Sequence, residues 1–153
     1  MRELVPELRE ELDLDFVVAN GENAAGGVGI TPKHADELFA AGVDVITLGN
    51  HTYRHREVWP YLDEQPNILR PANFLRTQPG HGTCVFERDG ASLGVVNLSG
   101  NLYMQAGEPA LVADPARIDR LRDLRRLRDA GLRAARGAGS ADLAQRRAGR
   151  ARA

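Results

Sequence analysis

Hydrophobic residues in the first 70 positions alternate between a helical period and short continuous runs. Apolar residues recur at helical spacing within residues 2–12, which predicts an amphipathic helix. Residues 14–20 (LDFVVAN) and 43–48 (VDVITL) are short valine-rich runs of the kind that buried parallel strands show. Between these runs, Thr31 followed by Pro32 predicts the capped start of a helix that ends at Gly42.

The rest of the first hundred residues predicts one more helix and then directly paired strands. A helix is expected over about residues 54–62, and NILRPANF (67–74) predicts a short strand interrupted by Pro71. The runs TCVFE and SLGVVNL flank the turn RDGA, which predicts a β-hairpin. The pattern therefore predicts an α/β domain whose parallel sheet is joined by antiparallel strands.

Polar residues follow both valine-rich runs. NGEN (20–23) follows the first run and Asn50-His51 follows the second. Ligands of parallel sheets bind beyond the carboxyl ends of the strands, where neighbouring strand ends can converge. These two clusters are therefore the candidate site.

The NGEN cluster has two interpretations. A carboxylate between two carboxamides supplies hard oxygen donors suited to a divalent cation or a polar ligand. Asn and Gly are also ordinary turn residues, and NGEN taken alone favours a turn. The glycines that follow do not form a phosphate loop, because no Gly-Lys-Ser/Thr follows and the spacing does not fit G-x-G-x-x-G.

The GNH tripeptide at 49–51 indicates a functional site more strongly than NGEN does. The glycine permits a tight exit from the strand, the Asn50 oxygen can bind a metal, and His51 can donate a proton or stabilise charge on a phosphoryl oxygen. A turn carrying a surface histidine is the alternative, and the NGEN cluster at the preceding strand end weighs against it. His34, His55 and His81 are expected to be exposed. Arg70 and Asn73 could contact a phosphate or shape a strand exit, and the sequence leaves both open.

Charge divides the chain into two kinds of sequence. Residues 1–113 contain 8 basic against 16 acidic side chains, whereas residues 114–153 contain 12 Arg against 5 Asp. We expect a partial domain over 1–114, a helix over 115–130 with Leu121, Leu124 and Leu127, and a disordered or irregular Ala/Arg/Gly-rich tail over 131–153. The basic end could also be a nucleic-acid arm, or the product of a reading-frame shift near residue 120. We favour the frameshift because Ala, Arg and Gly codons interconvert in GC-rich genes.

Composition narrows the location and the partners. No apolar stretch is long enough to span a membrane and the N-terminus is acidic, so we expect a cytoplasmic protein without a membrane partner. Cys84 has no second cysteine to pair with and is expected to be a small buried hydrophobe. Nucleic acid is not the expected partner, because no aromatic residue interleaves the arginines for base stacking.

Four segments together, DFVVANGENAAGGVGIT, GVDVITLGNHTY, NILRPANF and GVVNLSG, strongly resemble the bacterial YmdB-type metallophosphoesterases. This family belongs to the calcineurin-like phosphoesterases and is linked to hydrolysis of 2′,3′-cyclic nucleotides. The resemblance covers roughly residues 2–114 and the sequence diverges after about residue 120. It implies an incomplete calcineurin-like sandwich, with two β-sheets flanked by helices, and two divalent metal ions, iron or manganese. A family-like homo-oligomer is compatible with it.

The resemblance also assigns roles to individual residues. Glu22 would bridge both metals with Asn23 beside it, Asn50 would bind one metal, and His51 would assist the leaving group without binding metal. Attack on phosphorus by hydroxide, between metals about 3.5–4 Å apart, is the implied mechanism. No residue is assigned to substrate binding. The family commonly has an acidic residue shortly after GNH, where this chain has Arg54.

Parts of the family pattern are expected to be absent. The family opens with a buried strand and a Gly-Asp-x-x-Gly loop, whereas this sequence begins at the following helix, and no histidine follows His81. Truncation at the N-terminus is expected to expose the neighbouring strand, giving weak stability or dependence on another chain. We therefore expect an incomplete, weakly active or inactive fragment of a metal-dependent phosphodiesterase for a small phosphodiester or cyclic nucleotide. The alternatives are a non-catalytic remnant and a nucleic-acid-binding protein acting through the arginine-rich end.

Overall fold

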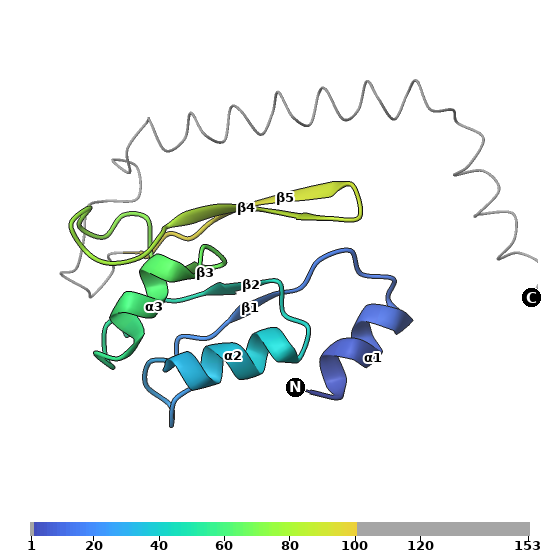
Figure 1. The fold of residues 1–153 in the computed structure, drawn as a ribbon, viewed down its shortest axis with the longest axis horizontal. Coiled ribbons are helices and arrows are strands. Elements are labelled where there is room, and N and C mark those ends of the chain that lie inside the picture. The colour runs from blue at the N-terminus through green and yellow to red at the C-terminus, as the bar shows by residue number, and fades with distance from the viewer. Residues whose placement is uncertain (1, 101–153) are drawn as a thin grey trace, which may run out of the picture. The chain divides into compact units, whose positions relative to one another are not determined.

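The computed structural model describes residues 2–100, which form short helices and strands in two sheets (Figure 1). Their order is α1 (Leu4–Glu11), β1 (Val18–Asn20), α2 (Pro32–Ala40), β2 (Val45–Thr47), α3 (Val58–Glu64), β3 (Ile68–Leu69), β4 (Thr83–Arg88) and β5 (Ala91–Val96). This arrangement confirms the α/β prediction. The helix expected over 115–130 and the tail 131–153 lie outside the described residues, so the division at residue 114 stays a prediction.

The first sheet is parallel and has the strand order β1-β2-β3. Val18 pairs with Val45, and Ile46 on the next strand pairs with Ile68. Parallel neighbours need a crossover, and α2 and α3 supply the two crossovers. The carboxyl ends of β1 and β2 therefore meet at one edge of the sheet, as the sequence predicted.

The second sheet is the predicted hairpin of β4 and β5, paired antiparallel from Thr83↔Val96 to Arg88↔Ala91. Its two turn residues, Asp89 and Gly90, both have positive φ (50° and 80°), which is the geometry of a type I′ turn. Cys84 on β4 is half-buried rather than fully buried, and burial raises the pKa of its thiol.

The hairpin lies on one side of the parallel sheet, and α1 and α2 lie on the other (Figure 1). Asn97, just after β5, joins the two sheets because its Nδ2 donates to the carbonyls of Leu48 (2.7 Å) and Leu69 (2.8 Å). Phe16 and Phe86 meet edge to face with ring centroids 6.1 Å apart. The Asn97 side chain and this aromatic pair thus help to hold the hairpin against the parallel strands.

The hydrophobic core lies between the parallel sheet and the helices. Fully burying a Val, Leu or Ile side chain contributes about 1.5–3 kcal/mol. The buried cluster consists of Val5, Ile30, Ala35, Val43, Ile46, Leu48, Val58, Leu62 and Ile68. Val18, on the outer strand β1, is by contrast 46% exposed. In the part of the chain that the structure describes, no helix has the length and apolar character needed to cross a membrane.

Two helices begin later than the sequence predicted, and a proline explains both shifts. The predicted helices of residues 2–12 and 54–62 would place Pro6 and Pro60 beyond the first turn, where a proline removes a needed N–H and clashes with the preceding turn. The observed starts at Leu4 and Val58 put each proline at the third helical position. There the backbone N–H has no partner within the helix, so its loss costs little.

Arg70 and Asn73, which the sequence left open, are structural. Arg70 is 1% exposed, and its guanidinium donates to the carbonyls of Gly80 (3.1 Å) and Pro71 (2.8 Å). Asn73, also 1% exposed, donates to the Ser99 carbonyl and accepts from the Ser99 N–H. Both side chains shape the exit from β3.

Candidate active site

Glu22 is positioned by the end of β1. The Gly21 N–H donates to the Thr47 carbonyl at 2.9 Å, which extends the pairing with β2 by one residue. The Asn20 side-chain oxygen then accepts from the Glu22 N–H at 3.2 Å and forms a local turn. These two bonds place the Glu22 side chain against the residues that follow β2.

Gly49 is the residue that makes room for the Glu22 carboxylate. A Cβ atom at position 49 would overlap the carboxylate of Glu22. Thr52, which is 1% exposed, holds the same turn because its hydroxyl donates to the Gly49 carbonyl at 2.6 Å. The sequence explained Gly49 by a tight exit from the strand, whereas the structure shows that close approach of a carboxylate requires it.

His51 is held by both residues of the preceding loop. Its backbone N–H donates to Glu22 Oε1 at 3.2 Å, and its Nδ1 lies 3.0 Å from Asn23 Oδ1. An amide oxygen only accepts hydrogen bonds, so Nδ1 carries the proton and donates. Glu22 Oε1 lies 3.6 Å from the same nitrogen. The ring is therefore oriented by two acceptors on one side, and no described residue binds its Nε2.

The cluster is open to ligands. The side chain of Glu22 is 17% exposed and that of His51 is 37% exposed, while Asn23 and Asn50 are exposed residues. Among residues 2–100, the Asn50 side chain has no hydrogen-bond partner. A carboxylate, two amides and an imidazole at one edge of a sheet can bind cations, orient a polar substrate and transfer a proton.

The type of donor atom in this cluster fits the metal centre that the resemblance implies, but the number of ligands is too small. Glu22, Asn23 and Asn50 offer the oxygen atoms that hard divalent cations prefer, and all three residues are at least partly exposed to solvent. Residues 2–100 nevertheless contain no group of three or more His, Cys, Asp or Glu side chains that could hold a metal. A centre with two metals therefore needs ligands from outside these residues.

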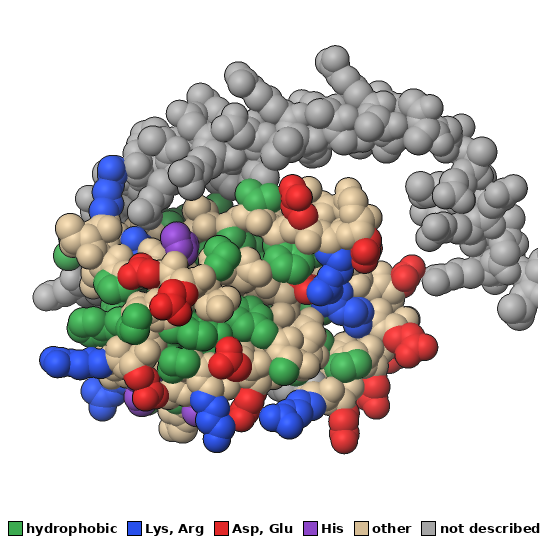
Figure 2. Space-filling model, viewed as in Figure 1, with side chains coloured by type: hydrophobic (Ala, Val, Ile, Leu, Met, Phe, Trp, Pro, Cys, Tyr) green, Lys and Arg blue, Asp and Glu red, His purple; other side chains and the backbone are tan. Residues whose placement is uncertain are grey.

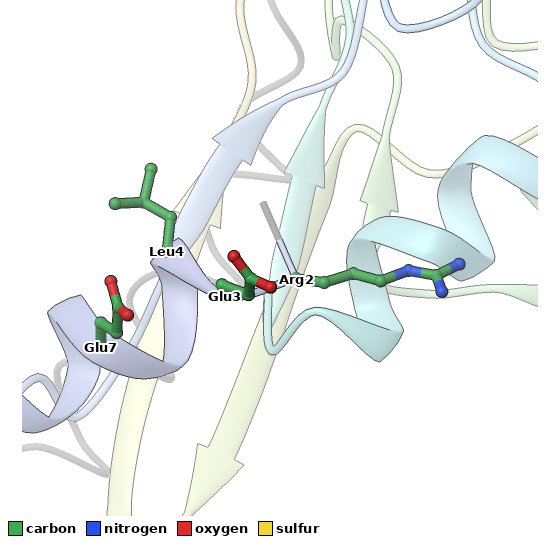
Figure 3. A pocket seen from close by; sticks show the side chains of 4 residues that line it. All are labelled: Arg2, Glu3, Leu4 and Glu7. Atoms are coloured by element: carbon green, nitrogen blue, oxygen red, sulfur yellow. The ribbon is translucent and has the colours of Figure 1, made fainter.

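A hollow elsewhere in the described residues does not compete for this role. Arg2, Glu3, Leu4 and Glu7 line it at the start of α1, and Figure 3 shows the Arg2 side chain extending away from Leu4 and Glu7. Acidic side chains gather over the α1 part of the surface (Figure 2). An acidic surface repels phosphate, so this hollow is a poor site for a phosphodiester.

The remaining histidines are not part of the cluster. His81 is exposed as expected, but His34 and His55 are half-buried and have structural partners. The Nδ1 of His34 lies 2.7 Å from the hydroxyl of the helix cap Thr31, and His55 Nε2 lies 2.9 Å from the Val28 carbonyl. His55 thereby holds the glycine-rich loop against the segment that follows β2.

Two residues position the cluster in ways that the sequence did not predict. Thr52 fixes the turn after β2, and Asn20 sets the direction of Glu22. Only the place of Asn20 at a strand end, beside a glycine, could have indicated its role. Nothing in the local pattern distinguishes Thr52 from an exposed loop threonine.

Comparison with known proteins gives consistent matches. The family described as YmdB-like protein matches residues 1–123. The 2′,3′-cyclic-nucleotide 2′-phosphodiesterase of Bacillus subtilis (strain 168) is 40% identical over 115 residues, which cover 74% of this chain and 44% of that protein. The chain thus spans about half the length of this relative.

Two solved structures share the fold. A hypothetical protein from Thermus thermophilus has a TM-score of 0.67 at 37% identity, covering 78% of this chain and 45% of that chain. A phosphatase from Mycoplasma pneumoniae has a TM-score of 0.61 at 30% identity, covering 72% and 43%. The family match extends over most of the chain, and the two structures agree with it. This chain belongs to the YmdB-like family.

Proposed function

We propose that this chain carries one part of a metal-dependent phosphodiesterase site that acts on 2′,3′-cyclic nucleotides or similar small phosphodiesters. The observation that carries the proposal is the joint binding of His51 by Glu22 and Asn23, which brings the two sequence clusters together. The name of the Bacillus subtilis relative supports the substrate class.

Iron or manganese ions belong to this proposal, with Glu22, Asn23 and Asn50 among their ligands. Such a metal pair supplies Lewis acidity at the phosphoryl oxygens. The described residues provide only part of the ligand set, so the remaining ligands of such a metal pair would come from outside residues 2–100.

His51 provides proton transfer in the proposed reaction. With Nδ1 donating to Asn23, the Nε2 atom is directed away from the loop that holds the ring. When the ring is protonated, Nε2–H can donate to the oxygen that leaves phosphorus. The Glu22 carboxylate at 3.6 Å faces the positive charge of that ring. Proton transfer by a positioned side chain typically contributes about 10²–10⁴-fold to a rate.

The test is hydrolysis of 2′,3′-cyclic AMP and of a chromogenic phosphodiester, with manganese or iron and with a chelator. Glu22→Gln and His51→Gln should each lower the metal-dependent rate by about 100-fold, because one removes a ligand charge and the other a proton donor. Metal binding, measured by equilibrium dialysis, should weaken in Glu22→Gln and stay near wild type in His51→Gln.

Glu87→Gln and His81→Gln are matched controls, since both side chains are exposed and lie outside the cluster. Their rates and their far-ultraviolet circular dichroism should equal those of the wild type. Absence of any metal-dependent turnover in the wild type would contradict the proposed activity of this chain. Turnover that survives both site substitutions would contradict the residue assignment instead.

A further inference from the structure

Arg54 is a cation at the candidate site whose side chain has no partner among residues 2–100. Its residue is exposed, and no described carboxylate or carbonyl binds its guanidinium. Most other arginines of this part of the chain are engaged. Arg9 and Arg88 both pair with Asp44, Arg56 lies over the ring of Trp59 at 5.9 Å, and Arg70 is buried.

Arg54 lies one turn after His51. Its backbone N–H donates to the His51 carbonyl at 3.1 Å. A turn closed by this bond brings the Cα atoms of its first and last residues within about 7 Å of each other. An arginine side chain is long enough to span that separation, so Arg54 can reach a ligand that His51 contacts.

The loop that carries Glu22 and Asn23 also packs against Arg54. A Cβ atom built on Gly29 would lie 2.9 Å from the Arg54 Cβ and 2.9 Å from His55 Cδ2. Gly29 has a φ of +77°, and His55 is tied to the carbonyl of Val28 in the same loop. The Arg54 Cβ therefore lies against the loop that carries Glu22 and Asn23, and the residue as a whole is exposed.

We propose that Arg54 forms an anion subsite that selects phosphodiesters carrying a second phosphate group, such as a nucleoside 2′,3′-cyclic phosphate with a 5′-phosphate. This inference rests on the proposed function, since it assumes that the reacting phosphodiester lies at His51. A guanidinium binds phosphate through two parallel N–H···O bonds and keeps its charge at all physiological pH values. Near the carboxylate of Glu22, a second phosphate needs such a cation to offset repulsion.

The experiment compares adenosine 2′,3′-cyclic phosphate with and without a 5′-phosphate, using the full chain. Dissociation constants are measured by equilibrium dialysis with a chelator present, so that hydrolysis does not interfere. The wild type should bind the 5′-phosphorylated nucleotide about fivefold more tightly, the ratio that an exposed ion pair provides. The ratio should shrink between about 0.01 M and about 1 M salt, because the Debye length falls from about 30 Å to about 3 Å.

Arg54→Gln should bring this ratio close to one, and Arg54→Lys should keep part of it. Arg56→Gln is the matched control, because it removes an arginine two positions away whose guanidinium lies over Trp59, and it should keep the wild-type ratio. A ratio that is unchanged in Arg54→Gln, or equal weakening for both nucleotides, would overturn the subsite. Failure of the wild type to bind either nucleotide would also overturn it.

Hydrolysis with manganese separates this inference from the proposed function. If binding shows the Arg54-dependent ratio but no protein turns over either nucleotide, the subsite stands and the activity of this chain fails. If both nucleotides are hydrolysed with equal kcat/KM and bound equally, the activity stands and the subsite fails.

Discussion

A carboxylate lies beside each end of β2, and the two carboxylates have opposite surroundings. At the amino end, the side chain of Asp44 is 1% exposed and its oxygens meet Arg9 (2.6 Å), Arg88 (2.8 Å) and the Val17 N–H (2.7 Å). At the carboxyl end, the Glu22 side chain is 17% exposed, and among residues 2–100 its carboxylate meets only the His51 backbone N–H and, more distantly, the His51 ring. The Asp44 carboxylate is satisfied, and the Glu22 carboxylate keeps lone pairs free.

This difference separates a carboxylate with a structural role from one that can still bind a ligand. Asp44 lies just before β2 and ties this strand to α1, to the start of β1 and to the hairpin, because its partners are Arg9, the Val17 N–H and Arg88. A buried charge with all its partners is costly to disrupt but has nothing left to offer a ligand. Glu22 contributes less to stability and retains the capacity to bind. The number of unused lone pairs, rather than burial alone, distinguishes the two ends.

The largest expected effect is on stability, at Asp44. Asp44→Ala should lower the free energy of unfolding by about 3 kcal/mol, because two arginines lose a common partner and the Val17 N–H loses its acceptor. Urea unfolding followed by circular dichroism measures it. Asp15→Ala, at an exposed position, is the control and should change stability by less than about 0.5 kcal/mol.

If Asp44→Ala lowers the free energy of unfolding no more than Asp15→Ala does, the comparison breaks. Asp44 would then be as dispensable for folding as an exposed carboxylate. Asp44→Asn provides a second measurement because it keeps the shape and can still accept the Val17 N–H. Its cost should lie between those of the wild type and Asp44→Ala.

A smaller effect on stability and a large one on activity are expected at Gly49. Gly49→Ala places a Cβ where the Glu22 carboxylate now lies, so that side chain must turn away from His51. The moving group is the end of a flexible side chain, so stability should fall by less than about 1 kcal/mol. Metal-dependent hydrolysis should fall by about 100-fold, since displacement of a site group by about 1 Å has that effect.

Gly100→Ala is the matched control for Gly49→Ala. A Cβ at Gly100 meets nothing within 4 Å, and the residue lies outside the cluster. Rate and stability should both match the wild type. If Gly49→Ala retains the full rate, hydrolysis does not require the present position of the Glu22 carboxylate. The contrast between Glu22 and Asp44 would then have no consequence for activity.

The smallest effect is expected at a hydrogen bond that has its partner but is exposed to solvent. It sharpens the comparison because it tests how much a partner contributes to stability when the contact itself is not buried. Tyr61 donates to Asp36 Oδ1 at 2.6 Å, and burial, followed by this hydrogen bond, raises the pKa of Tyr61 above its usual 10.0. The unfolded chain therefore releases the proton first as pH rises. The associated stability is complete below about pH 10 and is lost at higher pH.

Tyr61→Phe should be less sensitive to pH than the wild type between about pH 8 and about pH 11. The difference in unfolding free energy should stay below about 1 kcal/mol, because solvent screens the exposed contact. Urea unfolding at both pH values measures it. Identical pH dependence in the two proteins would show that the Tyr61–Asp36 hydrogen bond contributes nothing measurable.

Periodicity predicted every described element in its right order, because helix and strand periods are local properties of the chain. Its errors were at boundaries, and Pro6 and Pro60 account for the two shifted helix starts. The Thr31 cap was predicted correctly, since its side chain accepts from the His34 N–H. Capping and turn geometry depend on residues within one turn, so a sequence expresses them directly.

The site was only half accessible to sequence reasoning. Glu22, Asn23, Asn50 and His51 were predicted as site residues because they follow strands at family-like spacing. The contacts of His51 with Glu22 and Asn23, and the close approach of Glu22 to Gly49, join residues almost 30 positions apart. Arg70 and Asn73 show the same limit, because the sequence left both open between contacting a phosphate and shaping a strand exit, and only their backbone partners in the structure decide for the second.

By itself, the sequence determined which residue types end each strand, where the chain turns and which chemistry those residues can perform. The tertiary structure alone decided which of these polar groups are already satisfied. Pairing of β1 with β2 brings Glu22 against Gly49 and His51, and docking of the hairpin brings Arg88 onto Asp44. A sequence does not show whether a carboxylate already has hydrogen-bond partners, because those partners come from residues that are distant in the chain and are brought close only by folding.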